Sequence, residues 1–113
     1  MTASQVLQQV DTLLPNQYTA EQKLHWLHRA EGFAATFIGG TLPAEMTEDT
    51  VLAIAAPYSD LYRHYVEAQI HYVCGETERC NNAMLRWNEL LHGWRSYCLR
   101  HSAGGGAAAL KLC

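Results

Sequence analysis

The stretch that decides the fold is residues 80–98, CNNAMLRWNELLHGWRSYC. Its apolar residues recur at alternating steps of four and three, which is the period of one face of an α-helix. These residues are Cys80, Met84, Trp87, Leu91, Trp94 and Cys98. Glu76 and Glu78 favour a helix start just upstream, because carboxylates stabilise the positive end of a helix dipole. The pattern predicts a helix over about 76–101, about 39 Å long at ~1.5 Å per residue, against which we expect the other helices to pack.

Two helices are predicted upstream of residue 39. Residues 2–14 carry a single apolar stripe, which Pro15 interrupts. Thr19 and Gln22 have the spacing of a capping box, in which each side chain accepts a hydrogen bond from the other residue's backbone N–H. They predict a second helix that begins at Thr19 and runs to about residue 38. Its apolar stripe would consist of Trp26, Ala30, Phe33 and Phe37.

Another helix is predicted between Pro57 and Gly75. Proline favours the first turn of a helix, and glycine is typical of the position just after a helix end. Two apolar stripes run side by side along this helix, and both contain tyrosine. The connection that precedes it contains a short apolar run over 51–56, which is either a strand or a buried extended segment.

The elements together predict an all-α fold, with two parts along the chain. Residues 1–102 form a small bundle of about four helices, of which the last is the longest. Residues 103–113 form a flexible Gly-rich C-terminal tail, because Gly104–Gly106 interrupt any regular structure. We expect one domain, since 113 residues leave little room for two.

The composition indicates a surface that is partly covered by something else. Charged residues make up 17% of the chain, against about 25% in a typical domain, although small domains normally cover themselves with charge. The net charge of −3 and the eight Lys and Arg residues argue against a strongly basic nucleic-acid-binding protein. The apolar fraction of 49% argues against a disordered chain, and no apolar run approaches the ~18–20 residues of a membrane span.

The first fourteen residues bear on the cellular compartment of the protein, and the compartment determines whether its cysteines are thiols or disulfides. They contain neither the basic region nor the apolar region of a signal peptide. We therefore expect the protein to be made and kept in a reducing cytoplasm, where cysteines are thiols. The four cysteines are Cys74, Cys80, Cys98 and Cys113.

No motif in the sequence predicts catalysis, a metal or a cofactor. His71, Cys74 and Cys80 lie close together in the chain, but their spacing matches no standard zinc pattern. His25 and His28 are expected on a solvated polar face. The sequence also lacks a nucleophile elbow and a phosphate-binding loop. We therefore expect a protein that is not an enzyme.

Two sets of residues are candidates for contacts with partners. Tyrosines at helical spacing could stack on single-stranded bases, but an apolar ring with a polar hydroxyl is more typical of a protein interface. We therefore predict a subunit interface at Tyr58, Tyr62, Tyr65 and Tyr72. The second set is the apolar part of the tail, which could dock on another protein: Ala107, Ala108, Ala109, Leu110, Lys111 and Leu112.

The sequence resembles a pattern in small head–tail adaptor (connector) proteins of tailed bacteriophages, over most of residues 4–101. Near the N-terminus the similar residues include Leu14-Pro15-Asn16 and Glu21-Gln22-Lys23-Leu24. In the second half they include Ala56-Pro57-Tyr58-Ser59-Asp60-Leu61-Tyr62, Tyr65, Glu67-Ala68-Gln69-Ile70, Tyr72, Gly75-Glu76, Arg79, Asn81-Asn82 and Trp87-Asn88.

The resemblance implies a structural virion protein at the neck, made in the host cytoplasm. Such adaptors are small helical bundles that assemble as a ring, usually of twelve copies, beneath the portal protein. The ring extends the channel through which DNA passes, without sequence-specific binding, and gives a further neck or tail protein a platform. Many adaptors dock on the portal through the C-terminal segment, which implies that role for residues 107–112. Neither a membrane nor a cofactor is implied.

Two other functions remain open at the level of sequence. A small cytoplasmic helical module that regulates or binds nucleic acid could use the arginines of the last helix, although their spacing gives no single stripe. These arginines are Arg79, Arg86, Arg95 and Arg100. A metal-dependent helical enzyme is the third hypothesis.

Overall fold

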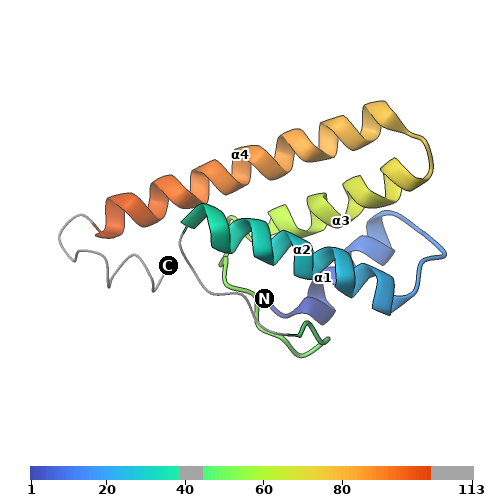
Figure 1. Ribbon diagram of the computed structural model, residues 1–113, viewed down its shortest axis with the longest axis horizontal. Helices are drawn as coiled ribbons and strands as arrows, with labels where there is room; N and C mark the ends of the chain where they lie inside the picture. The colour runs from blue at the N-terminus through green and yellow to red at the C-terminus, as the bar shows by residue number, and fades with distance from the viewer. Residues whose placement is uncertain (39–44, 103–113) are drawn as a thin grey trace.

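The helices begin and end close to where the sequence pattern places them. The computed structural model describes residues 1–38 and 45–102. Its helices are α1 (Ala3–Leu13), α2 (Ala20–Ile38), α3 (Asp60–Val73) and α4 (Thr77–Ser102), drawn in Figure 1. The described part of the chain contains no β-strand. The prediction of an all-α bundle with a long last helix is confirmed.

Local hydrogen bonds explain where α2 begins and α3 ends. The Thr19 hydroxyl accepts a hydrogen bond from the Gln22 N–H at 3.1 Å, and Gln22 Oε1 accepts one from the Thr19 N–H at 3.2 Å. This is the capping box that the sequence predicts. Gly75 follows the end of α3 with a φ of 77°, in the left-handed region that glycine adopts readily. Both predicted boundaries are therefore confirmed.

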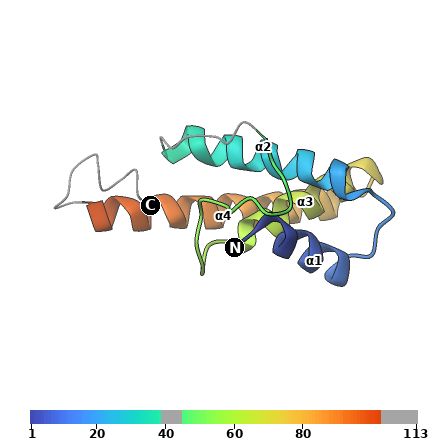
Figure 2. The same ribbon diagram turned by 90° about the horizontal axis from the view of Figure 1, so that it is seen from below.

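The central helix of the bundle is α3, which corrects the expectation that the others pack against the last helix. α3 packs against α1, α2 and α4, whereas α4 contacts α3 mainly and α2 to a smaller extent. Figure 1 shows α4 running back along α3, and Figure 2 shows α1 and α2 on different sides of α3. The helices α1 and α2 also contact each other. The physical reason is that α3 carries two adjacent apolar stripes and α4 one. The buried residues of α3 are Leu61, Tyr62, Tyr65, Val66, Ala68 and Ile70.

The buried face of α2 differs from the predicted stripe. Leu27, Ala30 and Ala34 are buried, together with the polar residues Lys23 and Glu31. Of the predicted stripe, Ala30 alone is fully buried: Trp26 and Phe37 are half-buried, and Phe33 is 52% exposed. The predicted stripe is wrong because Lys23 and Glu31 have hydrogen-bond partners inside the bundle, and the face that carries them is the buried one.

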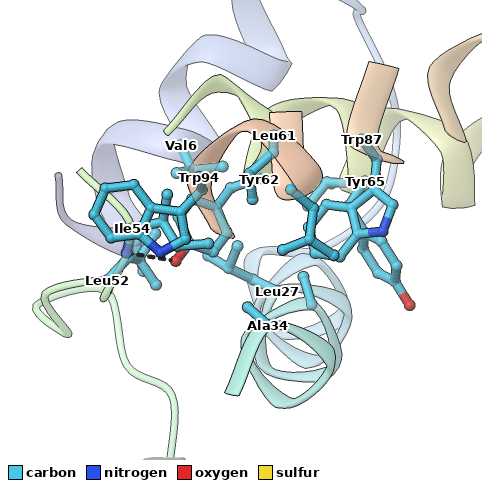
Figure 3. Packing of buried hydrophobic residues seen from close by; sticks show 14 of the residues in the cluster. Val6, Leu27, Ala34, Leu52, Ile54, Leu61, Tyr62, Tyr65, Trp87 and Trp94 are labelled. Atoms are coloured by element: carbon cyan, nitrogen blue, oxygen red, sulfur yellow. Dashed lines mark hydrogen bonds between the residues drawn. The ribbon is translucent and has the colours of Figure 1, made fainter. Parts of the chain in front are cut away.

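The last helix buries the face that its sequence predicts. Trp87, Leu91, Trp94 and Cys98 lie in the core, while Met84 at the start of the stripe packs on its edge. Figure 3 shows Trp94 and Trp87 from this helix lying over the core, with Leu27, Tyr62 and Ile54 among the neighbouring labelled residues. In the described part of the chain Cys74 and Cys80 are free thiols.

Within residues 45–59, an extended segment over 50–55 lies between two turns, and this part of the chain joins the N-terminus to the core. Leu52 and Ile54 are buried while Val51 and Ala53 are exposed, which is the alternation of an extended chain. Of the two readings of the apolar run, the structure has the buried extended segment, with one isolated antiparallel bridge between Thr2 and Val51. The N–H groups of Ala3 and Ser4 donate to the carbonyl oxygens of Thr50 and Glu48 at 2.9 Å each, so this segment caps α1. The Ala56–Pro57 peptide bond at its end is cis.

None of the described helices is both long and apolar enough to cross a membrane.

Candidate functional site

The four tyrosines predicted as a subunit interface occupy three different environments. Tyr62 and Tyr65 are in the core of the chain itself. Tyr58 is half-buried, and Tyr72 is 73% exposed on the last turn of α3. The interface prediction is therefore wrong for Tyr62 and Tyr65, because their rings are already buried by α2, α4 and residues 51–56. Of the four rings, that of Tyr72 is free to meet a partner.

The Tyr62 hydroxyl is the centre of a buried polar junction, which we call the Glu31 junction. It donates a hydrogen bond to Glu31 Oε1 at 2.6 Å and accepts one from the Ile54 N–H at 3.0 Å. The second carboxylate oxygen of Glu31 accepts a hydrogen bond from the Ala53 N–H at 2.9 Å. Burial raises the pKa of Tyr62, and the charge of Glu31 and its hydrogen bond raise it further. The junction therefore holds a protonated tyrosine and joins α2, α3 and the extended segment.

A second polar contact joins α1 to α2. The Lys23 ammonium lies 2.5 Å from Asp11 Oδ1, and the Lys23 side chain is 5% exposed against 53% for Asp11. Asn16 Nδ2 donates a further hydrogen bond to the same carboxylate oxygen at 3.1 Å. Burial alone would raise the pKa of Asp11, but the hydrogen bonds from Lys23 and Asn16 and the charge of Lys23 lower it on balance. This contact and the Glu31 junction are structural, since each satisfies buried polar groups.

The Tyr58 ring packs directly on the backbone of α4. Its centroid lies 5.7 Å from that of Trp94 and 5.9 Å from that of Tyr97. A Cβ at Gly93 would come within 2.9 Å of Tyr58 Cε1, so the absence of a side chain there allows the close approach. Tyr58 is thus part of the contact between the start of α3 and α4, and its partners are within the chain.

A groove lies between the second half of α2 and the middle of α4. Its volume is about 560 Å³. We call it the α2–α4 groove, and it is lined by Phe33, Thr36, Phe37, Tyr65, Met84, Trp87, Asn88, Leu91, His92 and Arg95. No motif in the sequence connects α2 to α4, so the sequence does not predict this set. Its one signal is Phe33 and Phe37, two residues of the predicted apolar stripe that line the groove.

The residues considered for a metal site are not gathered into one. His71 Nδ1 lies 3.4 Å from Glu76 Oε1, and the Cys74 thiol lies 3.9 Å from the Tyr18 hydroxyl. Within residues 1–38 and 45–102, no three His, Cys, Asp or Glu side chains are close enough together to hold a metal ion. His25 is exposed, as expected, while His28 is half-buried.

The arginines of α4 do not form a free basic stripe. Arg79 pairs with Glu76 at 3.1 Å, and Arg86 pairs with Glu89 at 3.6 Å. Arg95 instead lies over the Phe37 ring, with its guanidinium carbon 5.2 Å from the ring centroid. The predicted docking residues Ala107, Ala108, Ala109, Leu110, Lys111 and Leu112 lie outside the described residues.

Comparison of the chain with protein-family models, with curated proteins and with solved structures gave no significant match.

Proposed function

We propose that the chain is a structural virion protein without catalytic activity, a head–tail adaptor of a tailed bacteriophage. Twelve copies would form a ring beneath the portal protein, extend the channel for DNA and join the head to a further neck or tail protein. The resemblance over most of residues 4–101 supports this function. The fold agrees with it, since such adaptors are small helical bundles.

The observation that carries the proposal is the apolar surface at one end of the molecule. Tyr72 and Val73, on the last turn of α3, are 73% and 56% exposed. Leu13, on the last turn of α1, is 61% exposed, and the adjoining residues 14–18 line a hollow together with Ile70 and Cys74 of the α3 end. Exposed apolar groups gathered at one place are typical of a protein contact. Covering them would contribute about 25 cal/mol per Å² of apolar surface, which favours assembly over the free chain.

The proposed subunit contact is tested by placing charged side chains in this apolar end of the molecule. The double variant Tyr72→Lys/Val73→Lys should fold, because both side chains point mainly into solvent. It should fail to enter portal-containing particles, since two ammonium groups would be buried at the subunit contact. Val51→Lys is the matched control, because Val51 is 71% exposed but lies on the extended segment. Particles that incorporate the double variant as well as the control would contradict this assignment.

The resemblance to head–tail adaptors implies that residues 107–112 of the C-terminal tail dock on the portal protein. Deleting residues 103–113 should leave the helical circular dichroism unchanged and weaken association with the portal. If the truncated chain joined portal-containing particles as the full chain does, the docking role of residues 107–112 would be wrong while the adaptor ring itself could stand.

The alternative, a small cytoplasmic module that binds nucleic acid, requires a basic surface. We favour the adaptor because Arg79 and Arg86 are paired with glutamates, which reduces the positive charge that a phosphate backbone would meet. A mobility-shift titration of labelled DNA with micromolar protein separates the two functions. The adaptor should give no shift, whereas a salt-dependent shift would favour the alternative.

A further inference from the structure

The α2–α4 groove has the size and the walls of a small-molecule site. Its volume of about 560 Å³ falls within the range of about 300–1,000 Å³ that is usual for ligand pockets. Four aromatic rings line it, and three of them, Phe33, Tyr65 and Trp87, contact one another in series. The Phe33 and Tyr65 centroids are 6.1 Å apart, and the Tyr65 and Trp87 centroids are 5.0 Å apart. Phe37 completes the aromatic wall on the side of α2.

One end of the groove carries a positive charge that no carboxylate of the described residues neutralises. Arg95 lies over the Phe37 ring, and His92 meets the same ring edge-on at 4.9 Å between centroids. Within the described part of the chain no carboxylate pairs with Arg95, and none of the lining residues is acidic. The acidic residue nearest in the α4 sequence, Glu89, is paired with Arg86. Asn88 adds an amide to the lining of the groove.

We propose that this groove binds a planar aromatic carboxylate. The aromatic body would pack against Phe33 and Trp87, since aromatic pairs gain energy beyond the area that they bury. The carboxylate would pair with Arg95, whose planar fork of N–H groups matches two carboxylate oxygens. Phe37 holds the guanidinium over the groove, so little side-chain freedom is lost on binding.

The positive charge of the groove disfavours an occupant that places a lysine in it. Lys111 stands between Leu110 and Leu112, so docking these two leucines would bring an ammonium towards Arg95. The same charge favours an anion over a neutral or cationic ligand of equal size. This inference is independent of the adaptor proposal, which rests on the C-terminal ends of α1 and α3.

The test uses three probes of nearly equal shape on the full chain: 2-naphthoate, 2-naphthylmethanol and 2-naphthylmethylammonium. Isothermal titration calorimetry should show that the carboxylate binds at least tenfold more tightly than the alcohol or the ammonium. Amide chemical shifts of the residues around Phe33 and Trp87 should move on addition of 2-naphthoate. Equal affinities for the three probes, or no binding of 2-naphthoate, would overturn the proposal.

Two arginine variants separate a specific contact from general attraction of an anion. Arg95→Met should reduce the affinity for 2-naphthoate about tenfold and leave the affinity for the alcohol unchanged. Arg100→Met removes the same charge from an exposed site outside the groove, and it should leave both affinities unchanged. Equal losses in the two variants would show that net charge alone attracts the ligand, and the site would be rejected.

Discussion

At the scale of single residues, the interior of this protein depends on a few polar groups whose partners are distant in sequence. Glu31 and Tyr62 are 31 positions apart and meet in the Glu31 junction, where each hydrogen bond satisfies a group that water cannot reach. Lys23 finds Asp11 in the same way. Because a buried polar group without a partner is costly, these contacts select the relative placement of α1, α2 and α3.

Removing one hydroxyl tests the Glu31 junction. Tyr62→Phe keeps the ring and leaves Glu31 Oε1 without its donor and the Ile54 N–H without its acceptor. We expect the free energy of unfolding, measured with urea, to fall by about 1–3 kcal/mol. Tyr72→Phe removes an exposed hydroxyl and should change the stability by less than about 0.5 kcal/mol. Equal stabilities of the two variants would show that the junction contributes nothing.

The contact between Asp11 and Lys23 predicts a dependence of stability on acid pH. The pKa of Asp11 is lowered in the folded chain below its ordinary value of 3.8, so the unfolded chain takes up a proton first as the pH falls. The stabilisation from Asp11 is therefore present above pH 3.8 and is lost as the pH falls through the folded pKa. Asp11→Asn should flatten this part of the profile of urea midpoint against pH. A variant with the same acid slope as the wild-type chain would contradict the assignment.

At the scale of elements, the helices are predictable from sequence and their faces are predictable only in part. The spacing of Trp87, Leu91 and Trp94 predicts α4 and its buried face, because an apolar stripe on a helix packs against the core. The predicted face of α2 fails because Glu31 is buried by Tyr62, which belongs to another helix. Thr2 and Gln5 form a capping box at the start of α1, with the same three-residue spacing as Thr19 and Gln22. Gln5 Oε1 accepts a hydrogen bond from the Thr2 N–H at 2.9 Å, and the Thr2 hydroxyl accepts one from the Gln5 N–H at 3.3 Å.

The candidate site was beyond sequence reasoning for a related reason. The α2–α4 groove exists because Phe33 and Arg95 come from helices whose relative orientation is set by their packing on α3. No spacing within either helix encodes that orientation. The tyrosine pattern, by contrast, was visible in the sequence, but a tyrosine in the core and a tyrosine at an interface have the same helical spacing.

The close packing of α3 on α4 can be tested at Gly93. In a helix, Gly→Ala alone stabilises by up to about 1 kcal/mol. Here the new Cβ would meet the Tyr58 ring at 2.9 Å, and overpacking costs typically about 1–3 kcal/mol. We therefore expect Gly93→Ala to destabilise the chain by about 1 kcal/mol in urea denaturation.

A double-mutant cycle provides the control for Gly93. In a Tyr58→Ala background the Tyr58 ring no longer blocks a Cβ at position 93. Gly93→Ala should then stabilise the chain by about 0.5–1 kcal/mol. The sign of the effect should thus reverse between the two backgrounds. Additive effects of the two substitutions would mean that the Tyr58 ring and Gly93 are not in contact.

At the scale of the whole molecule, the low fraction of charged residues corresponds to exposed apolar side chains at particular places on the surface. The described bundle is elongated, with extents of 46 × 29 × 20 Å, and α4 runs along its length. Exposed apolar side chains occur at the end formed by α1 and α3, at the α2–α4 groove, on α4 and on the segment before α3. They are Leu13, Phe33, Val51, Tyr72, Val73, Leu85 and Leu99. A chain with 17% charged residues and this distribution of apolar groups is suited to a place among neighbours.

The central claim is that these neighbours are further copies of the chain, in a ring between head and tail. Electron cryomicroscopy of the neck of tailed particles purified from cells that produce the chain tests it most directly. The account predicts a ring of twelve copies beneath the portal, each fitted by the bundle of α1–α4, with Tyr72 and Val73 at the contact between subunits. A neck in which no density fits this bundle would contradict it.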